Sequence, residues 1–123
     1  MINDFENITY ELTESELDLI PKILNGLTAR NGKDMAVSGT TICQALKIKG
    51  ARLRKIINYI RVNHLIYGLC SCGKGYYIAS TLEELEGCII SLRQRVASQV
   101  KVLNALEKQT QMFGGSGQLS IFE

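Results

Sequence analysis

The sequence predicts a mainly α-helical protein with one small β-hairpin, an α+β fold class. Apolar residues recur at helical spacing in several segments between residues 12 and 62. The glycine-rich stretch SCGKG separates two short runs of strand-forming residues, which is typical of a hairpin. Residues 81–113 then carry a heptad-like apolar stripe. At 123 residues, the chain has the size of one ordinary domain with an appendage.

The first predicted helix begins in the stretch LTESEL. Thr13 is the expected N-cap, and Glu16, three residues later, completes a capping box. Leu12 and Leu17 occupy the two positions of a hydrophobic staple. An apolar stripe continues to Leu27, interrupted by Pro21, where the missing N–H predicts a kink. The stretch ARNGKD then indicates a loop.

Two further helices are predicted between residues 38 and 62. Ser38 is the expected cap of a short helix, and the stretch KIKG marks a break before the next one. In the later helix, apolar residues at positions i, i+3, i+4 and i+7 predict one buried face, made of Leu53, Ile56, Ile57 and Ile60. Two short helices joined by a tight turn are the arrangement of a helix-turn-helix motif.

The net charge of +2 conceals a strong asymmetry along the chain. Residues 1–20 hold six acids and no Lys or Arg, whereas residues 21–80 hold ten bases and one acid, Asp34. Residues 81–123 hold four bases and five acids. A strongly basic middle segment is the electrostatic signature of a protein that binds a polyanion.

Three helices followed by a hairpin, in this order and with this charge, resemble the winged-helix DNA-binding domain. The resemblance covers residues 10–80 and is carried by the element order, the placement of the bases and the return strand GYYIA. The sequence KGYY and the helix that follows it look most like small winged-helix proteins of phages and other mobile elements. The resemblance implies double-stranded DNA as the partner.

The candidate DNA-binding residues lie on the second of the two short helices, beside it and at the hairpin tip. Arg52, Lys55 and Asn58 share a face that we expect to enter the major groove, where Arg reads guanine and Asn reads adenine. Tyr59 on the flank is a candidate for stacking or for a phosphate contact. The expected phosphate contacts are Lys47, Lys49, Arg54 and Arg61, and at the hairpin tip Lys74.

The region 81–113 is predicted to be one long helix that mediates homodimerisation. Its stripe needs either the rest of the chain or a second copy to cover it, and Gln99 interrupts it. The expected contact residues are Leu85, Ile89, Leu92, Val96, Leu103 and Leu106. The predicted domains are therefore 1–80 for DNA binding, 81–113 for dimerisation and 114–123 as a flexible tail.

The tail combines the linker-like stretch GGSG with the pentapeptide QLSIF. This pentapeptide resembles the bacterial sliding-clamp-binding motif, Gln-Leu-x-Leu-Phe, with Ile121 in place of the second Leu. The resemblance implies that Leu119, Ile121 and Phe122 enter apolar clefts and that the amide of Gln118 supplies directional hydrogen bonds. The alternative is that the peptide packs on the chain itself.

Other classes of function have little support in the sequence. There is no phosphate-binding or nucleophile motif, so we expect no enzyme, catalytic residue or cofactor. Cys70, Cys72 and His64 do not match zinc-ligand spacings, so no metal site is predicted. No apolar run reaches the roughly 18–20 residues of a membrane span, and residues 1–18 do not resemble a signal peptide. We therefore expect a cytoplasmic protein without membrane contact, its four cysteines mostly thiols.

The leading hypothesis is a sequence-recognising DNA-binding accessory protein that docks on the replication sliding clamp. The first alternative is a dimeric winged-helix transcriptional regulator whose tail does not bind the clamp. The second is a protein-interaction adaptor that does not bind DNA.

Overall fold

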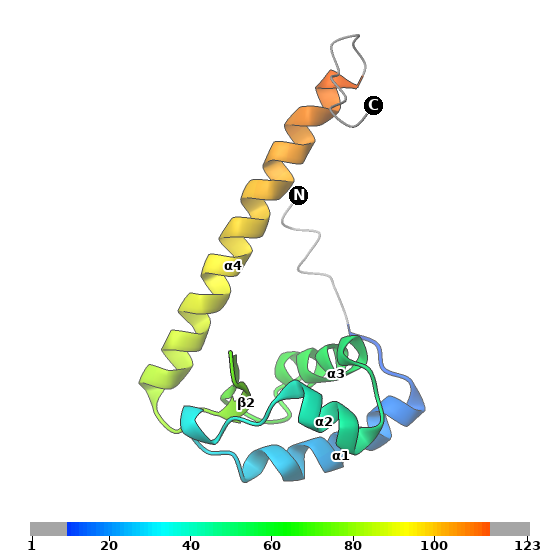
Figure 1. Ribbon diagram of the computed structural model, residues 1–123, viewed down its shortest axis with the longest axis vertical. Coiled ribbons are helices and arrows are strands. Elements are labelled where there is room, and N and C mark those ends of the chain that lie inside the picture. The colour runs from blue at the N-terminus through cyan, green and yellow to red at the C-terminus, as the bar shows by residue number, and fades with distance from the viewer. Residues whose placement is uncertain (1–9, 114–123) are drawn as a thin grey trace. The chain divides into compact units, whose positions relative to one another are not determined.

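The computed structural model describes residues 10–113 and confirms a mainly helical fold with one two-stranded antiparallel hairpin (Figure 1). The four α-helices of the described residues are α1 (Glu14–Thr28), α2 (Gly39–Leu46), α3 (Gly50–Val62) and α4 (Leu82–Gln109). The hairpin strands are β1 (Leu69–Cys72) and β2 (Gly75–Ile78), and the short 3-10 turns are η2 (Lys33–Met35) and η3 (Thr110–Met112). The chain divides into two compact units inside α4, after Cys88.

Helix α1 begins as the sequence predicts. The Thr13 side chain accepts a hydrogen bond from the backbone N–H of Glu16, and the Glu16 carboxylate accepts one from the backbone N–H of Thr13 at 2.9 Å. This reciprocal capping box satisfies two of the N–H groups that a helix start leaves without a partner. The helix runs through Pro21 as a single element, with Pro21 on its exposed side.

Helices α2 and α3 are separated by the predicted break. Ser38 caps α2 by accepting a hydrogen bond from the backbone N–H of Thr41 at 3.0 Å. Lys47 ends α2 in the left-handed conformation, with φ 57°, which turns the chain sharply toward α3. Lys49 is the residue immediately before α3, so both lysines lie in the turn between the two helices.

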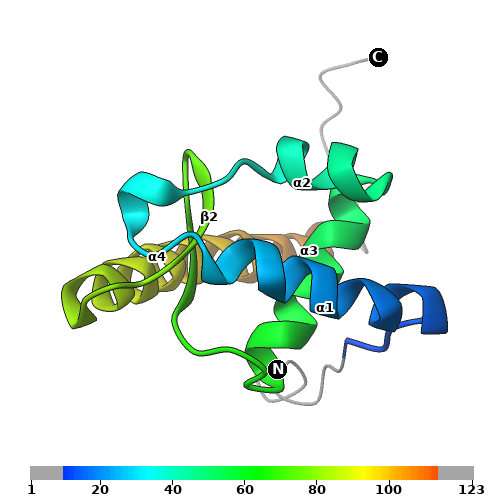
Figure 2. The same ribbon diagram turned by 90° about the horizontal axis from the view of Figure 1, so that it is seen from below.

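The core of the first unit forms where α3 packs against α1 (Figure 2). All four apolar residues predicted to form the buried face of α3 are at most 1% exposed. From α1 they meet Ile20, Ile23 and Leu27, and β1 adds Leu69. The helical periodicity of the sequence therefore identified the buried side of α3 correctly.

The hairpin is tied to the segment between α1 and α2. Strands β1 and β2 pair from Leu69 opposite Ile78 to Cys72 opposite Gly75. Val37 forms a single antiparallel bridge to Tyr76, with N···O distances of 2.9 and 2.8 Å between their backbones. Val37 thus acts as a minimal third strand beside β2, and Asn31 of the same connection forms an isolated parallel bridge to Ile78.

The backbone of Val37 comes so close to residue 75 that only glycine fits there. Its φ is 132°, a conformation that other L-residues rarely adopt. A Cβ atom there would lie 2.0 Å from the carbonyl oxygen of Val37, which is backbone and has no freedom to rotate away.

The start of α4 is fixed by a hydrogen-bond cluster around Glu84. Thr81 accepts a hydrogen bond from the backbone N–H of Glu84 at 3.2 Å. The carboxylate of Glu84 accepts hydrogen bonds from the backbone N–H of Ser80 at 2.9 Å and of Lys33 at 3.1 Å. These hydrogen bonds, led by the one from Ser80, lower the pKa of Glu84.

Among the described helices, none combines the length and the apolar character that a membrane crossing requires.

Candidate nucleic-acid interface

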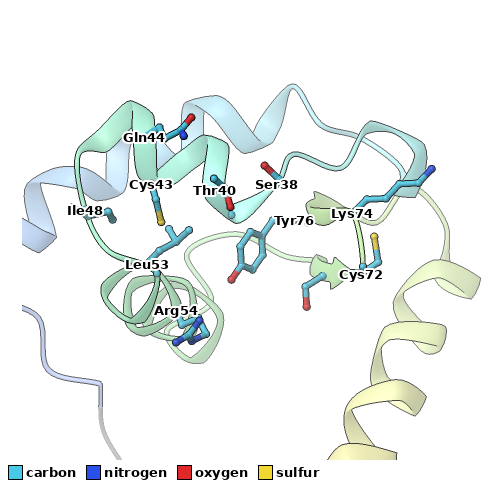
Figure 3. A pocket seen from close by; sticks show the side chains of 15 residues that line it. Ser38, Thr40, Cys43, Gln44, Ile48, Leu53, Arg54, Cys72, Lys74 and Tyr76 are labelled. Carbon is cyan, nitrogen blue, oxygen red and sulfur yellow. The ribbon is translucent and has the colours of Figure 1, made fainter.

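A concave groove of about 710 Å³ lies between α2, the first turns of α3 and the hairpin tip (Figure 3). Its floor is formed by Leu53 from α3 and the ring of Tyr76 from β2. Polar side chains of α2 line another side, among them Thr40 and Gln44. None of the 15 lining residues is acidic.

Two cations lie at the margins of this groove. Arg54 belongs to α3 and Lys74 to the turn at the hairpin tip, with Tyr76 between them (Figure 3). Both side chains are exposed, and within residues 10–113 neither takes part in an ion pair. Their charge is therefore available to an anion that enters the groove.

The groove also receives the N-terminal ends of two helices. Ser38 and Gly39 at the start of α2, and Gly50 at the start of α3, all contribute to its lining. A helix N-terminus presents free backbone N–H groups and a partial positive charge, both of which favour phosphate oxygens. The two helix N-termini and the two side-chain cations thus all contribute positive charge to the groove.

Arg52 and Lys55, which the sequence suggested as base-reading residues, each form an intramolecular ion pair, although their side chains remain 47% and 39% exposed. The Nε atom of Arg52 lies 2.9 Å from Glu16 Oε2, and the Nζ atom of Lys55 lies 2.9 Å from Glu16 Oε1. The Glu16 side chain is only 3% exposed, so α1 supplies a buried anion beneath the two cations. Hydrogen bonds from the Thr13 backbone and from Lys55 hold the pKa of Glu16 at about 2, so the carboxylate is ionised at neutral pH.

Arg61 also has an intramolecular role. Its Nε atom donates a hydrogen bond to the backbone carbonyl of Leu69 at 2.9 Å, and its guanidinium reaches the hydroxyl of Ser71 at 3.4 Å. Because Leu69 and Ser71 both belong to β1, Arg61 fastens the end of α3 to the hairpin. A phosphate contact by this side chain would have to compete with these hydrogen bonds.

The other four predicted DNA contacts do not line the groove. Lys47 and Lys49 are exposed in the turn between α2 and α3, but they are not among the residues that line the groove. Asn58 is half-buried, and Tyr59 packs against the core. The structure therefore brings Arg54 and Lys74 to one groove and leaves the other candidates outside it.

The sequence reasoning did not select Thr40 and Gln44. Both are polar, exposed residues of α2, a helix in which the sequence pattern predicted no DNA contact. Neither side chain is charged, so the distribution of Lys and Arg along the sequence could not indicate them.

The cysteines are free thiols, and burial protects one of them. Cys43, Cys70, Cys72 and Cys88 form no disulfide. Burial raises the pKa of Cys70 to about 11, so this thiol keeps its proton at neutral pH. In the part of the chain that the structure describes, no three His, Cys, Asp or Glu side chains lie together as metal ligands would.

Comparison with known proteins supplies no relative for this chain. No protein-family model matches it, and no curated protein or solved structure is significantly similar to it. Any function must therefore be argued from the groove and the sequence.

Proposed function

We propose that the protein binds double-stranded DNA through a winged-helix domain formed by residues 10–80. The element order supports this: three helices, a minimal strand at Val37 between the first two, and then a two-stranded hairpin. In such a domain α3 is the recognition helix and the turn at Lys74 belongs to the wing.

The observation that carries the proposal is the groove without acidic lining, which holds Arg54, Lys74 and two helix N-termini. The exposed cations attract the phosphate backbone, which positions DNA without reading its sequence. Arg54 and Gln44 are the side chains in the groove whose hydrogen-bonding groups suit base edges in a major groove. We therefore assign base reading to them rather than to Arg52 and Lys55, which both form ion pairs with Glu16.

The test is a titration of duplex DNA with the intact protein and single alanine variants. We expect Arg54→Ala and Lys74→Ala each to weaken binding at least about fivefold, because each removes an unpaired cation from the interface. Lys22→Ala is the matched control, since Lys22 is exposed on α1 and does not line the groove. Equal effects of all three substitutions would refute the groove as the interface. Absence of duplex binding at low salt would instead favour the protein-interaction adaptor.

A second proposal rests on the QLSIF pentapeptide, which lies outside the described residues. We propose that Gln118, Leu119, Ile121 and Phe122 dock on a bacterial sliding clamp, so that the protein brings its DNA together with the replication machinery. Burying one such apolar side chain contributes about 1.5–3 kcal/mol before ordering costs, so a single peptide gives a weak contact.

Clamp docking is tested by direct binding of the purified protein to a sliding clamp. Phe122→Ala should abolish micromolar binding while leaving DNA affinity unchanged. If the intact protein shows no clamp binding at high concentration, the regulator without clamp binding becomes the better interpretation.

A further inference from the structure

The core positions of α4 follow a heptad repeat along the whole helix and are apolar except at Gln99. Steps of three and four residues alternate without a break through the 28 residues of α4, which is four heptads. We denote the two core positions of the repeat a and d. The a positions are Leu82, Ile89, Val96 and Leu103, and the d positions are Leu85, Leu92, Gln99 and Leu106.

These core positions are largely uncovered within the described chain. Ile89 is 41% exposed, Leu92 51%, Val96 53% and Leu106 56%. Aliphatic side chains left half exposed in one continuous stripe mark an interaction surface rather than scattered surface residues.

We propose that a second copy of this chain covers the stripe, forming a parallel, in-register, two-stranded coiled coil. The choice of side chains favours this partner, because β-branched residues at a with leucine at d select two parallel strands. The β-branched residues at a are Ile89 and Val96, and the leucines at d are Leu85, Leu92 and Leu106.

Gln99 distinguishes the parallel arrangement from the antiparallel one. In a parallel dimer in register, each d residue faces its own copy, so the two Gln99 amides can hydrogen-bond to each other. In an antiparallel dimer, a d residue faces an a residue, and every a position of α4 is apolar. A buried amide would then lack a partner, which is costly. The polar position thus fixes both register and direction, the role that a single buried polar residue has in coiled coils.

The size of the surface is also adequate for a dimer. A specific interface generally needs about 1,000 Å² of buried area in total. Five aliphatic side chains of the repeat are between 41% and 69% exposed in each copy, and burying them in both copies brings the interface to this order.

Two adjacent isoleucines provide a matched test by sedimentation equilibrium. Ile89 lies at an a position, whereas Ile90 lies at b, outside the core, and is 54% exposed. The intact protein should be a dimer at micromolar concentration. Ile89→Lys should weaken dimerisation at least about tenfold, because it places a charge in the seam, and Ile90→Lys should change it less than about twofold. A monomeric intact protein, or equal effects of the two substitutions, would overturn the proposal.

Direction is tested by oxidative cross-linking of single added cysteines in a background in which Cys43, Cys72 and Cys88 are replaced by serine and only the fully buried Cys70 remains. Gln99→Cys should form a disulfide with its own copy, because facing d residues in a parallel dimer are close enough to be bridged. Gln94→Cys, on the outer side of the repeat, is the control and should remain uncross-linked. A stable dimer in which Gln99→Cys cross-links no better than Gln94→Cys would refute the parallel register. None of these measurements depends on DNA binding.

Discussion

Replacing Gly75 by alanine tests whether the hairpin depends on its contact with the α1–α2 connection. The new Cβ atom would lie 2.0 Å from the Val37 carbonyl oxygen, so the Val37–Tyr76 bridge has to open or the strand has to move. Loss of the two backbone hydrogen bonds costs about 0.5–1.5 kcal/mol each. The left-handed side of φ adds about 1–2 kcal/mol for a residue with a Cβ. We expect a total destabilisation of about 2–5 kcal/mol.

The assay is urea unfolding of the intact protein, with Gly73→Ala as the matched control. Gly73 lies two residues away in the same hairpin, and a Cβ atom there meets nothing within 4 Å. Gly73→Ala should leave the free energy of unfolding within about 1 kcal/mol of the unmodified protein. If Gly75→Ala is as stable as Gly73→Ala, the bridge between Val37 and Tyr76 does not constrain the hairpin, and the reasoning is wrong.

The remaining predictions concern the core and its buried anion. Glu16→Gln should make the free energy of unfolding less dependent on pH in the acid range. The pKa of Glu16 is lowered from 4.5 to about 2 in the folded protein. The ionised carboxylate therefore stabilises the fold fully above pH 4.5, and this stabilisation is lost as the pH falls through about 2. Glu84 is present in both the unmodified protein and Glu16→Gln, so the difference between their free energies of unfolding from pH 2 to pH 7 reports Glu16 alone. A difference that does not change with pH would contradict the ion-pair assignment. Ile56→Ala should destabilise the fold by about 2–5 kcal/mol in the same urea assay, because Ile56 is 0% exposed in the α1–α3 core. A cost below about 1 kcal/mol would show that this core position is not closely packed.

Much of the fold follows from local sequence signals. The capping box at Thr13, the buried face of α3 and the glycine-rich hairpin turn each depend on residues a few positions apart, so their patterns are visible in the chain. The heptad stripe of α4 is likewise a local repeat. These features are determined by backbone geometry and side-chain periodicity, which a single sequence displays directly.

The site was harder to predict because it depends on contacts between distant residues. Glu16 was recognised as part of a capping box, but Arg52 lies 36 positions away, and no spacing rule announces their ion pair. The count of charges along the chain gave no sign that Arg52 and Lys55 are ion-paired. Packing of α1 on α3 brings the carboxylate of Glu16 to both of them. Arg61 contacts Leu69 and Ser71, which lie only eight and ten positions later, but no helix or strand spacing indicates these contacts either.

The most direct test of the central claim is the salt dependence of DNA binding by the intact protein, Lys74→Ala and Arg52→Ala. We expect the logarithm of the association constant to fall linearly with the logarithm of salt concentration, with a slope of about −0.9 per phosphate contact. Lys74→Ala should make the slope shallower by about 1, because one phosphate contact from an exposed cation is lost. Arg52→Ala should change the slope much less, since that guanidinium is held in an ion pair with Glu16. No measurable duplex binding, or a slope that responds to Arg52→Ala and not to Lys74→Ala, would contradict the account.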